Sequence, residues 1–76
     1  MGKPTRITNS IRALRFARGE MTQADLAQRI GVTRQTVIAI EQGRYSPSLE
    51  VAFQIARVLK VPLDEVFQYP DGEGEP

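Results

Sequence analysis

Apolar residues recur at intervals of three, four and seven positions through most of the chain, which is the spacing of amphipathic helices. The clearest case covers residues 49–59, where one helical face would carry Leu49, Ala52, Ile55, Ala56 and Leu59. Ser48 precedes this segment and suits a helix N-cap. The pattern predicts four helices and a short fifth over 63–67, and it assigns to the core Leu26, Ala27, Ile30, Val37, Ile40, Leu49, Ile55, Ala56, Leu59, Leu63, Val66 and Phe67.

Capping residues and glycines set the expected helix limits. The first helix is expected to follow Thr8 or Asn9 and to run to Arg18, with Gly19 just beyond its end. The second begins after a Thr at position 22, with an acidic residue at 25 near its positive dipole end, and ends at a glycine at position 31. The third follows another Thr and is closed by a glycine, which gives a helix over 33–42.

The segment 31–43, GVTRQTVIAIEQG, is rich in β-branched residues, which alone would favour a strand. As a strand, neither face would be cleanly apolar. At roughly 100° per residue, a helix instead gathers on one side Thr33, Val37, Ile40 and Glu41. The opposite side carries Gln35, Ile38 and Ala39, with Arg34 and Thr36 at the margins. The helical interpretation is therefore favoured.

Two charged residues fall on inward faces of the predicted helices. Glu41 lies on the inner side of the third helix, and Arg15 lies on the inner stripe of the first. An unpaired buried carboxylate is costly, so an ion pair between them is expected to fix how the two helices dock. The alternative is that both side chains reach solvent without meeting.

Charge is distributed unevenly, although the formal net charge is only +1. Residues 1–44 hold eight basic and three acidic residues, whereas residues 45–76 hold two basic and six acidic residues. Seven of those eight basic residues are Arg, which suits bidentate contacts with phosphate or guanine. The asymmetry indicates a polyanion at the N-terminal half, or simply a solvated surface of uneven charge.

Composition bounds the chemistry. The chain has no Cys and no His, which removes disulfides, thiolate metal sites and the usual general base. No nucleophile and base pattern or phosphate-cradling loop is present, so we expect no enzyme and no cofactor. No apolar run approaches the roughly 20 residues that span a bilayer, and a cytoplasmic protein without membrane contact is the plain expectation. No pocket for a small-molecule ligand is evident.

The outer face of the third helix mixes polar and apolar residues where a merely solvated helix would show Lys and Glu. Arg bonds guanine O6 and N7, Gln bonds adenine N6 and N7, and small apolar groups contact the thymine methyl. The composition of this face is therefore suited to reading base edges in double-stranded DNA.

Residues 22–43, TQADLAQRIGVTRQTVIAIEQG, resemble the helix-turn-helix of the Cro/cI repressors and the broader Xre-type regulators. The flanks IRALR and SPSLEVAFQIARVLKVPLDEVF fit the same family, so the resemblance covers 8–68. It implies an all-α fold, a compact five-helix lambda-repressor-like domain, with its motif over 22–42 and a recognition helix over 33–42. Residues 1–7 would be a flexible basic arm and 69–76 an acidic disordered tail.

This chain departs from the family pattern at two places. The turn GEMTQ has one residue more than the common version, and Lys60 stands where glycine usually follows the fourth helix. Gly31 matches the family's turn glycine, for which a positive φ is expected.

The resemblance also implies roles by position. The recognition helix would lie in the major groove, with base contacts from Thr33, Arg34, Gln35, Thr36, Ile38 and Ala39. Phosphate contacts would come from Gln23 at the start of the second helix, and from Arg44 and Tyr45 in the loop after the third.

The expected function is a sequence-specific DNA-binding transcriptional regulator, a repressor that occupies a promoter site. Because one such domain contacts few base pairs, a homodimer is expected, formed through the fourth and fifth helices. The alternative is a protein-interaction module, an antitoxin or an adaptor, built on the same fold.

Overall fold

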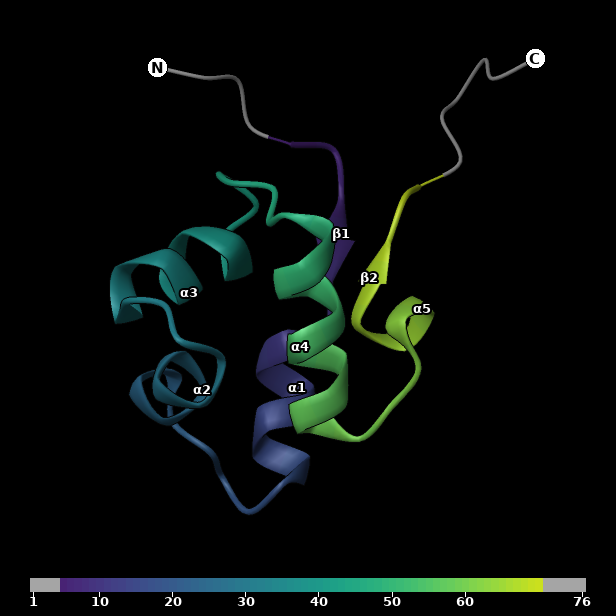
Figure 1. Cartoon of the computed structure of the whole chain (residues 1–76). Coiled ribbons are helices and arrows are strands. Elements are labelled where there is room, and N and C mark those ends of the chain that lie inside the picture. The colour runs from purple at the N-terminus through teal and green to yellow at the C-terminus, as the bar shows by residue number, and fades with distance from the viewer. Residues whose placement is uncertain (1–4, 71–76) are drawn as a thin grey trace, which may run out of the picture.

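The computed structural model describes residues 5–70, which form five helices and two very short strands (Figure 1). The expected arm 1–7 is described only from Thr5, and the expected tail 69–76 only through Pro70; their remaining residues lie outside the described part. In chain order the elements are β1 (Thr8–Asn9), α1 (Ile11–Ala17), α2 (Gln23–Ile30), α3 (Arg34–Glu41), α4 (Leu49–Leu59), α5 (Leu63–Val66) and β2 (Phe67–Gln68). The five-helix expectation is confirmed.

Three helices begin at the N-cap residues that the sequence indicated. The side chains of Thr22, Thr33 and Ser48 each accept a hydrogen bond from the backbone amide three residues later, at 2.9, 3.1 and 3.2 Å. Each bond satisfies one of the amides that a helix start leaves without a partner. These caps depend only on neighbouring residues, and all three predictions are confirmed.

The start of α1 differs from the expectation. Thr8 and Asn9 do not occupy the N-cap position, because both belong to β1, which pairs antiparallel with β2, although the Asn9 side chain still accepts from the amide of Ile11. The N-cap is Ser10, whose side chain makes no capping hydrogen bond. For the same reason α5 ends at Val66, one residue earlier than expected, since Phe67 belongs to β2. In Figure 1 the two strands lie side by side next to α5.

The helices α2 and α4 end at residues in the left-handed conformation. Gly31 closes α2 with φ +76°, the positive value expected for the family's turn glycine. Lys60 closes α4 with φ +62°, although a Cβ makes that conformation unfavourable. Lys60 thus adopts the left-handed conformation that glycine usually adopts at this cap, and its side chain makes that conformation strained.

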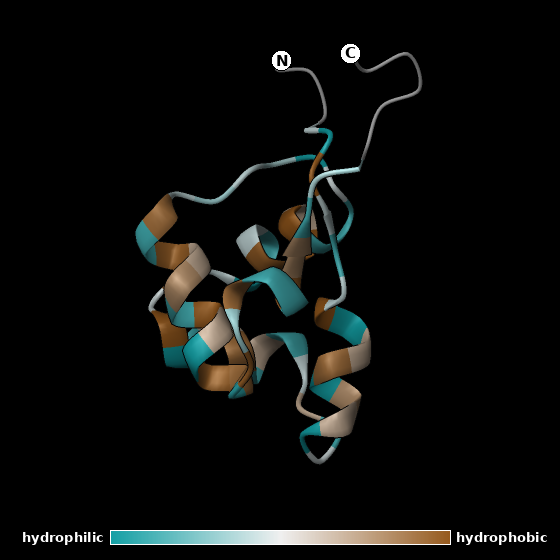
Figure 2. Ribbon diagram, turned by 90° about the vertical axis from the view of Figure 1, so that its right-hand side faces the viewer, coloured by the Kyte–Doolittle hydropathy of each residue, from teal (hydrophilic) through white to brown (hydrophobic). Residues whose placement is uncertain are grey.

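One core joins the helices, and apolar and polar segments alternate around them (Figure 2). Most predicted core residues are buried, with Leu63 and Phe67 only partly covered. Leu49 is an error of the sequence analysis, since 69% of it is exposed. It is the first residue of α4, and the buried residues of that helix begin only at Ala52. Met21, between α1 and α2, joins the core instead.

No helix within residues 5–70 combines the length and the apolar character that crossing a bilayer would require.

Candidate nucleic-acid interface

The helix α3 is anchored by one side and exposed on the other. Val37 and Ile40 are 1% and 2% exposed and pack in the core, while α2 packs along the helix. Arg34 and Gln35, in the first turn, are both exposed to solvent. The capping hydroxyl of Thr33 also lies 3.0 Å from the hydroxyl of Thr36. The core side fixes α3 in place, and the two side chains suited to base edges project outward.

The apolar side chains expected on the outer face are less exposed than the sequence analysis supposed. Ile38 and Ala39 are both partly buried. At roughly 100° per residue, Ile38 lies about 60° from Gln35 and about 100° from Val37, so it belongs to the outward side near its border with the core side. A partly buried Ile38 presents only part of its surface to a partner.

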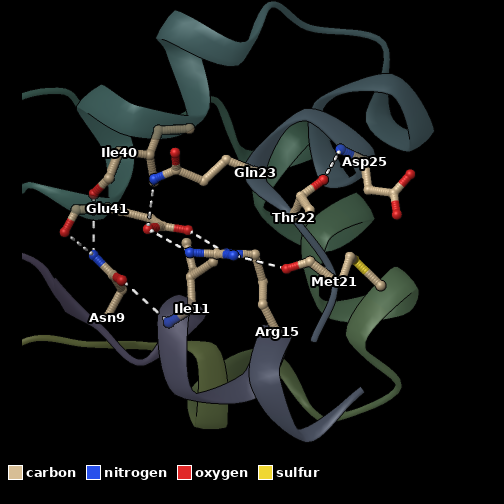
Figure 3. Close-up of polar contacts among 9 residues, drawn as sticks. All are labelled: Asn9, Ile11, Arg15, Met21, Thr22, Gln23, Asp25, Ile40 and Glu41. Carbon is tan, nitrogen blue, oxygen red and sulfur yellow. Dashed lines mark hydrogen bonds and ion pairs between the residues drawn. The ribbon is translucent and has the colours of Figure 1, made fainter. Parts of the chain in front are cut away.

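The expected ion pair is present beneath α3 (Figure 3). Nε of Arg15 donates to Oε2 of Glu41 at 2.7 Å, and Nη2 donates to Oε1 at 3.2 Å. Nη1 of the same Arg15 donates to the backbone carbonyl of Met21 at 2.7 Å. Only 8% and 9% of the two side chains are exposed. The bidentate geometry and the third bond offset the cost of burying both charges.

Gln23 joins this buried pair. Its Nε2 donates to Oε1 of Glu41 at 3.1 Å, which ties the first residue of α2 to the last residue of α3 (Figure 3). Gln23 is expected from the sequence to contact a phosphate, and its bond to Glu41 is not indicated by any sequence pattern. One of the two amide hydrogens is used by Glu41, so the second remains for another acceptor.

Asn9 is a residue whose role the sequence analysis missed. Its Nδ2 donates to the backbone carbonyls of Ile40 and Glu41, at 3.0 and 3.4 Å. Its Oδ1 accepts from the amide of Ile11 at 3.2 Å. Asn9 thereby satisfies the end of α3 and the start of α1 with one side chain (Figure 3). The capping chemistry of Asn was recognised in the sequence, but its partners on α3 are distant along the chain.

The loop after α3 carries the other expected phosphate contacts. Arg44 is exposed, and 51% of Tyr45 is exposed. The amide of Arg44 donates to the carbonyl of Ala39 at 3.0 Å, so the turn that presents these side chains is closed onto the helix. On its other side, the amide of Thr5 donates to the carbonyl of Gly43 at 3.2 Å.

The expected contact surface has residues at both ends of α3. Arg34 and Gln35 lie at the start of α3, and Arg44 and Tyr45 follow its end. Gln23 is bonded to the last residue of α3. Within residues 5–70 there is no cluster of three or more potential metal-ligating side chains. The chemistry that this surface offers is hydrogen bonding and positive charge.

Comparison with known proteins agrees with this geometry. A family model described as helix-turn-helix matches residues 11–66. An HTH-type transcriptional regulator of Methanocaldococcus jannaschii is 53% identical over 53 residues, covering 70% of this chain and 80% of the relative. The transcriptional repressor RstR of a cryptic CTXphi phage in Vibrio cholerae is 37% identical over 59 residues, covering 78% of this chain and 52% of RstR.

A crystal structure of a Bacteroides fragilis protein superposes with a TM-score of 0.71, covering 82% of this chain and 98% of that one. At 22% sequence identity this likeness shows the fold alone. The family model and the sequence relatives show more than the fold. The chain belongs to the helix-turn-helix family of Xre and Cro/cI type, whose motif here comprises α2, the turn at Gly31 and α3.

Proposed function

We propose that the protein is a sequence-specific, double-stranded DNA-binding transcriptional regulator that inserts α3 in the major groove. The observation that carries the proposal is the pair Arg34 and Gln35, exposed on the first turn of a helix held from behind by the core and by the buried Arg15–Glu41 pair. A helix fits the major groove of B-DNA, and its N-terminal residues meet the base edges.

The base-reading roles follow from side-chain chemistry. Arg34 suits guanine through a bidentate contact with O6 and N7, and Gln35 suits adenine through N6 and N7. Thr33 and Thr36 offer hydroxyls at the same end of the helix. Ala39 and the accessible part of Ile38 would contact thymine methyl groups further along the groove.

Phosphate contacts would fix the register of α3 on the duplex without reading sequence. Gln23 is suited to this role through its remaining amide hydrogen, and Arg44 and Tyr45 through exposed side chains beyond the end of α3. Gln23 is bonded to the last residue of α3, and Arg44 and Tyr45 follow that helix, so these contacts would hold α3 at the end opposite the base-reading turn.

Repression by occupying a promoter site is the regulatory role that we favour. It is supported by the similarity to RstR, which is named a transcriptional repressor. Occlusion needs only tight and specific binding. A reporter gene downstream of a selected binding site should be less active when the protein is expressed, and increased expression would contradict this role.

The mode of DNA binding is testable by NMR titration of the labelled protein with a short duplex. The largest amide shifts are expected at residues 33–36, at Gln23 and at residues 43–45, while the exposed side of α4 shifts little. Shifts concentrated on α4 and α5, or no shifts at millimolar duplex, would contradict the proposal.

We further propose that the regulator acts as a homodimer, because specific sites usually contain two half-sites about one helical turn apart. Leu49 and Phe53 are one helical turn apart on α4 and are 69% and 54% exposed. Tyr69, after β2, is 63% exposed. Val66 of α5 is buried and Leu63 partly covered, so α4 offers the larger apolar surface.

The dimer is tested by sedimentation at tens of micromolar protein. We expect a dimer for the wild type, and a shift toward monomer for Phe53→Ser, because a hydroxyl replaces the exposed ring at the contact. Gln54→Ser, at the neighbouring exposed position, is the control and should leave the dimer intact. A wild type that stays monomeric both free and on DNA would contradict dimerisation.

A further inference from the structure

An open groove of about 1030 Å³ lies between α1, the start of α2 and α3. Arg12 and Phe16 line it from α1, Gln23 from the start of α2, and Arg34 and Gln42 from the two ends of α3. Arg34 is also the leading base-reading residue, so the groove opens beside the surface proposed to meet DNA. The α1 wall of this groove has no role in the proposed function so far.

Some of the charged side chains that line the groove are paired and buried, and others are exposed to solvent. Arg15 and Glu41 lie at its base and neutralise each other as a buried pair. Arg12 and Arg34 are exposed, and within residues 5–70 neither guanidinium makes an ion pair. One exposed acid, Glu20, also lines the groove. It follows the C-terminal end of α1, whereas Arg12 lies near the N-terminal end of that helix. The available charge on the α1 wall near its start is therefore positive.

Arg12 is held in place by an aromatic side chain. Its guanidinium carbon lies 5.7 Å from the ring centre of Phe16, one helical turn later, and the ring is also 5.8 Å from the guanidinium of Arg15. A cation over a ring is attracted to it, yet the guanidinium keeps its N–H donors for other partners. Phe16 is 52% exposed, so the contact lies at the open side of the groove.

We propose that this groove seats a phosphate of the DNA backbone and that Arg12, oriented by Phe16, is a direct contact to it. The inference rests on the proposed function and extends the interface to α1. Gln23 lies in the same groove with one amide hydrogen free, so it and Arg12 would approach the phosphate strand from two different helices.

The first test is the salt dependence of duplex binding for Arg12→Ala. A protein that loses one phosphate contact should lose about 0.9 from the slope of log K against log salt concentration. The ratio of the wild-type affinity to the Arg12→Ala affinity should therefore fall about threefold between 50 and 200 mM salt, by the same factor for every duplex sequence. Arg57→Ala is the control, because it removes the same charge from an exposed site on α4 that does not line the groove.

A slope for Arg12→Ala equal to that of Arg57→Ala overturns the inference. The proposed function is judged separately by the wild type: if it binds duplexes with steep salt dependence, only the role of Arg12 has failed. Thermal unfolding of both variants checks the fold, and little change is expected since Arg12 is exposed.

The second test locates the contact. Single phosphates of a bound duplex are replaced in turn by uncharged methylphosphonates. One position in each half-site should weaken the wild type several-fold and leave Arg12→Ala unaffected. If the variant remains as sensitive as the wild type at every position, Arg12 touches no phosphate.

Phe16→Leu completes the double-mutant cycle. It keeps an apolar side chain at position 16 but removes the ring, so a smaller loss of affinity than for Arg12→Ala is expected. In the Arg12→Ala background the same change should add nothing. Additive losses would contradict the orienting role of Phe16.

Discussion

An arginine lies on each side of α3, and the two differ in burial and pairing. On the inner side, the guanidinium of Arg15 makes three hydrogen bonds, two to a carboxylate and one to a carbonyl, and both partners in the ion pair are buried. On the outer side, Arg34 is exposed and makes no ion pair among residues 5–70. The paired arginine positions the helix, and the arginine without an ion pair stays available for the base contact that we propose.

The largest expected effect comes from breaking the inner side. Arg15→Ala or Glu41→Ala leaves an uncompensated buried charge and should cost about 3–5 kcal/mol of unfolding free energy. Urea denaturation measures it. The double change Arg15→Met with Glu41→Leu removes both charges and should recover a large part of that loss. If either single variant costs less than about 1 kcal/mol, the pair does not hold the helices together.

The outer side should respond in binding and hardly in stability. Arg34→Ala and Gln35→Ala should each reduce discrimination at one or two base pairs by about 1–3 kcal/mol. Their unfolding free energies should stay within about 0.5 kcal/mol of the wild type, because both side chains are exposed. Binding to matched and single-mismatch duplexes measures the first quantity. Equal loss on every duplex would make these residues phosphate contacts instead.

Asn9 joins α3 to α1. Its side chain bonds to carbonyls at the end of α3 and to an amide at the start of α1. Asn9→Ala should cost about 1–2 kcal/mol of unfolding free energy. Thr8→Ala is the matched control, since its only side-chain bond among the described residues is exposed and 3.3 Å long. Hydrogen exchange should show faster opening of the last turn of α3 in Asn9→Ala. Equal stability of the two variants would remove this role.

The smallest expected effect concerns the backbone conformation at two helix ends, Lys60 after α4 and Gly31 after α2. Lys60→Gly should raise the unfolding free energy by about 0.5 kcal/mol, because relief of left-handed strain exceeds the added chain entropy of glycine. Gly31→Ala, where a Cβ would meet no atom within 4 Å, should cost about 1 kcal/mol through backbone strain alone. Chemical denaturation of both variants is the measurement. A destabilised Lys60→Gly protein would contradict the strain at that cap.

Interactions between residues close together in the sequence could be predicted, and most of those between distant residues could not. The caps at Thr22, Thr33 and Ser48 act within one turn, so local residue patterns were sufficient. The Arg15–Glu41 pair was predictable because a buried acid requires a partner and the inner faces offered one.

The failures involve long-range geometry. Periodicity gives the angle of Leu49 around α4 but not whether a neighbouring helix reaches that end, and it was wrongly assigned to the core. The bonds of Asn9 to α3 join residues 31 and 32 positions apart, which no local pattern reveals. The β1–β2 pairing joins residues still further apart in sequence, and it displaced the expected start of α1.

The most direct test of the account is selection of bound duplexes from a random-sequence pool, performed with the wild type and with Arg34→Ala. We expect the wild type to enrich a defined motif, with two symmetric half-sites about one helical turn apart. Arg34→Ala should lose preference at one or two positions of each half-site and keep the rest. Enrichment of no motif by the wild type, or of an identical motif by both proteins, would contradict base reading by the outer side of α3.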